Sequence, residues 1–123
     1  MVVDYLYYTG VFLGTAVSEA DWTRASREAL QYVEVHTYGR LHGLAELPEN
    51  VRLAVCAVAE VCAAQHAAAE KRTAAAGVKT FSNDGYSETL ADAVQLDADF
   101  VRQKAEALDT YLPRAHPLRY AGA

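Results

Sequence analysis

Histidines and cysteines are the side chains of this chain that could bind a metal, and carboxylates are those that could act as acid or base. The four histidines are scattered and do not combine with Cys or acids into the ligand pattern of a zinc site; they are His36, His42, His66 and His116. Glu60 and Glu70 lie about 15 Å apart along one expected helix, too far for a paired-carboxylate site. The sequence therefore predicts no metal centre and no carboxylate dyad.

Other catalytic patterns are also missing. Gly10 and Gly14 are not followed by the Lys-Ser or Lys-Thr of a phosphate-binding loop, and no serine lies in a nucleophile elbow. Cys56 and Cys62 point about 240° apart around one expected helix, so they cannot pair with each other. We favour two buried, reduced thiols over metal or redox chemistry. The sequence predicts a non-enzymatic protein with no catalytic residue, no metal and no cofactor.

Composition indicates one domain, residues 1–123. The formal net charge of −5 argues against a protein that grips nucleic acid through its phosphates, because that requires a basic surface. The segment Met1–Leu6 has neither the basic nor the apolar region of a signal peptide. No stretch is expected to approach the roughly 20 apolar residues of a membrane span. These features predict a cytosolic protein.

Three helices carry the predicted domain. The first begins at Ser18, an N-cap residue with acids in the turn after it, and it ends at Gly39 and Gly43. Its apolar face ends in a histidine that we interpret as a hydrogen-bonded core or interface residue; the face consists of Trp22, Ala25, Ala29, Val33 and His36. The second helix follows Pro48 and runs from Val51 to Arg72.

The second helix is apolar nearly all round, which indicates burial on most sides. Two interpretations remain open: a central helix of the domain core, or a helix with one side against another subunit. The third helix runs from about Gln95 to Leu112 and ends before Pro113. Its predicted core face is the line Val94, Ala98, Val101, Ala105, Leu108 and Leu112. The tail, residues 113–123, is predicted to be extended, and its apolar and aromatic residues indicate that it docks.

A short insert, residues 77–90, separates the second and third helices. Asp84-Gly85 is the preferred centre of a tight hairpin turn, and β-branched and aromatic residues flank it at alternating positions. A hairpin alone is marginal in water, so we interpret it as a docking element. The predicted fold is all-α, a small domain with three main helices and a short β-hairpin-like insert between the second and third.

The N-terminal segment, residues 1–17, is rich in aromatic side chains and lacks helical periodicity. Its rings belong to Tyr5, Tyr7, Tyr8 and Phe12. Tyrosine is enriched at interfaces because it offers a large contact area at a low entropy cost. The sequence leaves two roles open for these rings: an interface with a partner, or a cap on the domain's own core.

Five segments, taken in order, resemble a known family. They are Tyr7–Gly14, the stretch from Glu19 to Trp22, Tyr38-Gly39-Arg40, Val51–Glu60 and Asn83–Ser87. From about Tyr5 to Gly122 the chain is similar to head–tail connector proteins (adaptor or head-completion proteins) of long-tailed bacteriophages and prophages. The tail departs from the pattern: family members often carry Leu-Leu-Tyr-Arg-Gly where this chain has Leu118-Arg119-Tyr120-Ala121-Gly122.

The resemblance implies structural work in the virion without catalysis. Such connectors are small helical proteins that form a ring, usually of twelve copies, beneath the portal. The chain would then be present in the host cytoplasm during assembly and afterwards in the virion neck. The ring extends the DNA channel after packaging, lets DNA pass without sequence-specific binding, and contacts the portal and the next neck component. An alternative of another class is a small cytosolic helical module that binds one protein partner.

Contacts with neighbouring subunits or with the portal are predicted for the hairpin, the N-terminal rings and the tail. The predicted interface residues are Tyr7, Tyr8, Phe12, Phe81, Asn83, Asp84, Gly85, Tyr86, Leu118 and Tyr120.

Overall fold

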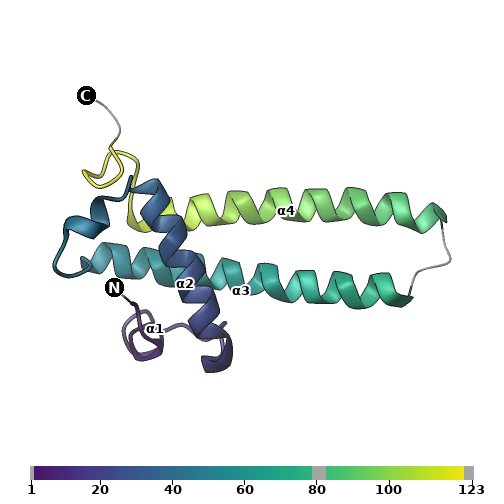
Figure 1. The fold of residues 1–123 in the computed structure, drawn as a ribbon, viewed down its shortest axis with the longest axis horizontal. Coiled ribbons are helices and arrows are strands. Elements are labelled where there is room, and N and C mark those ends of the chain that lie inside the picture. The colour runs from purple at the N-terminus through teal and green to yellow at the C-terminus, as the bar shows by residue number, and fades with distance from the viewer. Residues whose placement is uncertain (1, 79–82, 121–123) are drawn as a thin grey trace.

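The computed structural model describes residues 2–78 and 83–120. Its elements are α1 (Tyr5–Gly10), α2 (Glu19–His36), the short 3-10 helix η1 (Arg40–Gly43), α3 (Glu49–Val78) and α4 (Asn83–Tyr111). Helices α3 and α4 run antiparallel and side by side, and α2 crosses them near one end (Figure 1). We call the end that holds α1, α2 and the tail the base (residues 2–62 and 99–120). The two-helix part beyond it is the arm (residues 63–78 and 83–98).

Helix α2 begins and ends where the sequence indicates. The Ser18 side chain accepts a hydrogen bond from the backbone N–H of Asp21 at 3.3 Å and so caps the first turn. After the helix, Tyr38 and Gly39 adopt positive φ angles of 57° and 72°, and this left-handed backbone prevents continuation. The predicted apolar face is buried through Trp22, Ala25, Ala29 and Val33.

Helix α3 is the central helix of the base. Val51, Val55 and Val58 are 0% exposed and belong to one core cluster with residues of α1, α2 and α4. The part of α3 up to Cys62 therefore lies in the domain core, and contact of its other side with another subunit stays a prediction. Its end at Val78 lies beyond the predicted end at Arg72.

The apolar character of α3 has a second aspect. Over Glu49–Lys71 the helix is long and apolar enough, by length and composition alone, to cross a membrane. This corrects the expectation that no stretch approaches such a span. The same stretch supplies much of the buried core of the base, and 39% of the window is buried inside the domain, so packing within the domain accounts for part of its apolar composition.

The predicted β-hairpin between the second and third helices is wrong. Helix α3 continues to Val78 and α4 begins at Asn83, so Asp84 and Gly85 lie in the first turn of a helix. Residues 79–82 lie outside the described part of the chain, and the part that is described contains no strand. The alanine-rich run before Val78 favours helix continuation, and the helix dipole favours an acid at the start of α4. Together these local preferences outweigh the turn preference of Asp-Gly.

Helix α4 starts before the predicted position at Gln95, and the second half of its predicted face packs on the core, together with Ala107 and Tyr111, which were expected to widen that face. Leu108 and Leu112 are 0% exposed, as the pattern predicts. Ala98 and Val101 belong to the same predicted line but are exposed, Val101 by 66%. A heptad line drifts by about 20° per repeat around a straight helix, so its two ends do not face the same neighbour.

Both chain ends are more compactly folded than predicted. Residues Tyr5–Gly10 form α1, and Asp4 caps this helix by accepting a hydrogen bond from the backbone N–H of Tyr7 at 2.8 Å. The described part of the tail, residues 113–120, is not extended. It turns back on itself, since the N–H groups of Arg119 and Tyr120 both donate to the His116 carbonyl at 2.9 Å.

Candidate interaction surfaces

Tyr8 is a core residue and not a surface one. Its side chain is 0% exposed, and its ring stacks on that of Trp22 with centroids 4.5 Å apart. Its hydroxyl donates to Glu60 at 2.9 Å and accepts from the N–H groups of Ala16 and Val17 at 2.9 and 3.0 Å. Burial is the largest cause of the raised pKa of this phenol; the hydrogen bonds from the Val17 and Ala16 N–H groups act in the opposite direction, and Glu60 adds to the rise. Through these hydrogen bonds, Tyr8 links the N-terminal segment to Glu60 of α3.

The other N-terminal rings close the same end of the base. Tyr7 and Phe12 are half-buried and pack against the core cluster, and Phe12 meets Tyr111 edge-on at 6.2 Å. The Tyr7 hydroxyl is buried without a hydrogen-bond partner among the described residues, and burial is the largest cause of its raised pKa. The interpretation that these rings cap the domain's own core is confirmed. An interface role for the exposed edges of Tyr7 and Phe12 stays a prediction.

Apolar side chains beside these rings do reach the surface. Four large hydrophobic residues of the first thirteen are more than half exposed; they are Val2, Leu6, Val11 and Leu13. The sequence did not predict this N-terminal apolar surface, because by residue type the aromatic side chains are the distinctive feature of the segment. The sequence does contain a signal for this surface: Leu6 lies between Tyr5 and Tyr7, and Val11 precedes Phe12, so these aliphatic side chains do not share the face of the aromatic rings.

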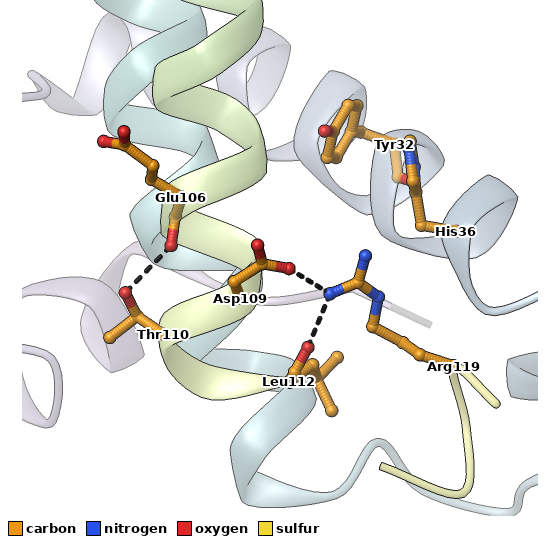
Figure 2. A network of polar contacts seen from close by, with 7 residues as sticks. All are labelled: Tyr32, His36, Glu106, Asp109, Thr110, Leu112 and Arg119. Carbon is orange, nitrogen blue, oxygen red and sulfur yellow. Dashed lines mark hydrogen bonds and ion pairs between the residues drawn. The ribbon is translucent and has the colours of Figure 1, made fainter. Parts of the chain in front are cut away.

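The tail is held against the base by two arginines. Arg119 donates to the carboxylate of Asp109 and, at 2.8 Å, to the carbonyl of Leu112, so the tail is tied to the last turns of α4 (Figure 2). Arg40 donates to the carbonyl of Pro117 at 2.7 Å. Leu118 packs against the core cluster. The predicted docking of the tail is thus observed, and the surface that receives it belongs to the same chain.

An exposed group of aromatic and basic residues surrounds the docked tail. Tyr38 is 61% and Tyr120 54% exposed, and the guanidinium of Arg40 lies 5.3 Å from the centroid of the Tyr38 ring. Arg40 also lines a shallow hollow with Ala115, Pro117 and Tyr120. We call Tyr38, Arg40, Pro117 and Tyr120 the basic-aromatic patch. Only Tyr120 was predicted as an interface residue, although Tyr38 and Arg40 stand in a motif of the family resemblance.

The predicted interface residues do not form one surface. Asn83–Tyr86 lie at the start of α4, at the far end of the arm, whereas the N-terminal rings and the tail lie at the base (Figure 1). Phe81 lies outside the described residues. The predicted set therefore divides into two groups at opposite ends of the molecule.

The histidines and cysteines have structural contacts. His36 Nδ1 is hydrogen-bonded to the Tyr32 carbonyl at 2.8 Å, and the two rings are 4.1 Å apart. His66 pairs with Glu28 at 2.7 Å and joins α3 to α2. Cys56 and Cys62 are free and buried, and burial raises the pKa of the Cys56 thiol to about 12. Among the side chains that the structure describes, those of residues 2–71 and 97–120, no group of three or more His, Cys, Asp or Glu could hold a metal ion.

Comparison of the chain with models of protein families, with curated proteins and with solved structures finds no match.

Proposed function

We propose that this protein is a non-enzymatic head–tail connector of a long-tailed bacteriophage or prophage. In this proposal it assembles as a ring under the portal, joins the DNA-filled head to the tail, and extends the DNA channel. The proposal starts from the family resemblance of five segments between Tyr7 and Ser87. The fold and its surfaces supply the physical support.

The observation that carries the proposal is the arm. Helices α3 and α4 continue well past the packed base as a two-helix projection (Figure 1). Ala98 and Val101 are exposed on it or at its root, so apolar helix surface is available to a neighbour. A projection at one end and a separate exposed patch at the other suit heterologous contacts, in which different surfaces of successive copies meet.

Charge supports a channel role. The chain has a formal net charge of −5, so a ring of such chains neutralises few phosphates. DNA contacts that release few counterions are weak and non-specific. DNA would therefore pass through the ring and not be held by it.

The portal contact is assigned to the tip of the arm. This keeps Asn83–Tyr86 as proposed interface residues, now at the start of α4 and not in a hairpin. The N-terminal apolar surface and the basic-aromatic patch, both on the base, then remain for the neighbouring subunits and for the next neck component.

Native mass tests the proposal. Light scattering over a wide concentration range is combined with negative-stain images of the same fractions. Twelve copies of 13.4 kDa give roughly 160 kDa, and a ring-shaped species of that order is expected, either alone or after addition of portal-capped heads. A compact dimer in both situations would contradict the proposal and would favour the alternative of a regulatory module that binds one partner.

A further inference from the structure

A pocket of about 190 Å³ lies between the N-terminal segment and α2. Val2 and Val3 form its wall on the N-terminal side. On the α2 side its lining includes the apolar side chains of Trp22 and Leu30 and the guanidinium-bearing side chain of Arg27, and no Asp or Glu lines it. The pocket therefore combines apolar walls with a cation.

The walls of the pocket are held in place by contacts within the chain. The Trp22 indole N–H donates to the Val3 carbonyl at 2.9 Å, so the two sides of the pocket are joined by a hydrogen bond. Val3 and Trp22 are only 3% and 4% exposed, and the Trp22 ring stacks on that of Tyr8. A ligand that enters finds the site already formed, so little ordering cost opposes binding.

Arg27 supplies an unpaired positive charge at this pocket. It is exposed and forms no ion pair among the described residues, whereas Arg24, on the same helix, pairs with Glu28 at 3.7 Å. A carboxylate is the group that complements a free guanidinium. Because an exposed ion pair contributes little free energy, the charge selects the ligand and the apolar walls supply most of the binding.

The volume of the pocket decides between two kinds of ligand. A protein cavity of about 150 Å³ holds one benzene molecule, whereas sites for small molecules usually measure about 300–1,000 Å³. A pocket of about 190 Å³ therefore fits one large apolar side chain. Val2 belongs both to the pocket and to the N-terminal apolar surface, and it is 81% exposed. A protein segment can cover this surface while its side chain fills the pocket.

We propose that the pocket holds a large apolar side chain of a partner protein, and that Arg27 pairs with a carboxylate beside that side chain in the partner. The inference deepens the proposed function, on which it rests for the partner being another component of the neck, and it names the chemistry of the contact. A buried apolar anchor beside a charged group at the rim is the common arrangement of a protein interface.

Blocked dipeptides test the pocket in the full chain. Trp22 is the single tryptophan, so its indole N–H gives one signal in the NMR spectrum of the ¹⁵N-labelled protein and reports on the pocket. The probe is acetyl-Glu-Leu-amide, and acetyl-Glu-Ala-amide and acetyl-Gln-Leu-amide are its comparisons. We expect the probe to bind roughly tenfold or more tightly than the Ala peptide. Its advantage over the Gln peptide should be about two- to fivefold.

Arg27→Gln separates the two parts of the contact. This variant should lose the preference for Glu over Gln and keep the preference for Leu over Ala, because only the charge is removed. Arg24→Gln is the matched control: it makes the same change at an exposed position of α2 that does not line this pocket, and it should keep both preferences. A change of preference at constant anchor binding is not produced by misfolding.

Three results would overturn the inference: a Trp22 signal that does not move with the probe, equal binding of the Leu and Ala peptides, or a preference for Glu that persists in Arg27→Gln. A Trp22 signal that shifts with protein concentration alone, and does so less in Arg27→Gln, would assign the pocket to a second copy and contradict a separate partner. The proposed function is tested separately with portal-capped heads. Rings without peptide binding would refute this inference alone, and peptide binding without rings would refute the proposed function alone.

Discussion

The Tyr8 hydroxyl satisfies three polar groups at once: Glu60 and the N–H groups of Ala16 and Val17. Tyr8→Phe keeps the ring but leaves the two N–H groups without their acceptor, and a buried unsatisfied group costs about 1–3 kcal/mol. We expect the free energy of unfolding, measured by urea denaturation, to fall by about that amount. Tyr38→Phe, at an exposed ring, is the control. Equal stability of the two variants would contradict the role assigned to Tyr8.

Gly14 makes room for the same ring. A Cβ atom at this position would lie 2.1 Å from the nearest atom of the Tyr8 ring, a distance that neither group can accept without movement. Overpacking of this kind costs about 1–3 kcal/mol, so Gly14→Ala should lower the urea midpoint clearly. Gly43→Ala is the matched change, because no atom lies within 4 Å of a Cβ there. A Gly14→Ala variant as stable as Gly43→Ala would show that Tyr8 does not occupy the observed position.

Burial of the Cys56 thiol makes stability depend on alkaline pH. Its pKa is raised from 9.0 to about 12, so the folded state holds the proton more tightly than the unfolded state. The stabilisation is fully present below pH 9 and is lost as pH rises toward the folded pKa. Urea midpoints should therefore fall between about pH 9 and pH 11, and less steeply in Cys56→Ala. Identical pH profiles for the two proteins would contradict a buried thiol at this position.

At the scale of elements, a substitution at Gly85 distinguishes the observed helix from the predicted hairpin. In a helix, replacing Gly by Ala stabilises by up to about 1 kcal/mol. In a hairpin turn with positive φ the same change destabilises, because Ala has a side chain. Since Gly85 lies in the first turn of α4, Gly85→Ala should raise the thermal midpoint slightly and should not lower helix content by circular dichroism. A lowered midpoint would favour the turn.

The sequence predicts an element well when the residues that stabilise it are close together in the chain. The start of α2 at Ser18 and the end of α4 before Pro113 were predictable, because capping and proline act within a turn. Helix α1 was not, since its stability comes from Tyr8 contacts with α3, far away in the sequence. The tail fold depends in the same way on Arg119 reaching Asp109 (Figure 2).

The two groups of predicted interface residues also show that contacts between distant parts of the chain are not predictable from local sequence. Their types were informative, since Tyr120 is exposed and Leu118 helps to seat the tail. Their accessibility was not predictable, because burial of Tyr8 depends on how three helices meet. Arg40 was overlooked because its role comes from contacts with Tyr38 and Pro117 that only the folded chain brings together.

At the scale of the whole molecule, the base and the arm are physically different. Among the residues of α3 whose burial is described, which end at Lys71, the buried core reaches to Cys62, so we expect the base to hold the fold without the full arm. The arm is then free to serve assembly. The length of the arm is therefore needed for the proposed assembly function and is not needed for the stability of the base.

Shortening the arm tests this division. Removing residues 71–77 from α3 and 84–90 from α4 deletes about two turns from each helix and keeps the remaining faces in register. The base should keep its cooperative unfolding and a far-ultraviolet spectrum reduced only in proportion to length, whereas ring formation with portal-capped heads should be lost. Substituting Ala67→Gln, on the exposed surface of α3, is a control that keeps arm length. Rings that form equally well with the shortened chain would mean that the base alone carries assembly.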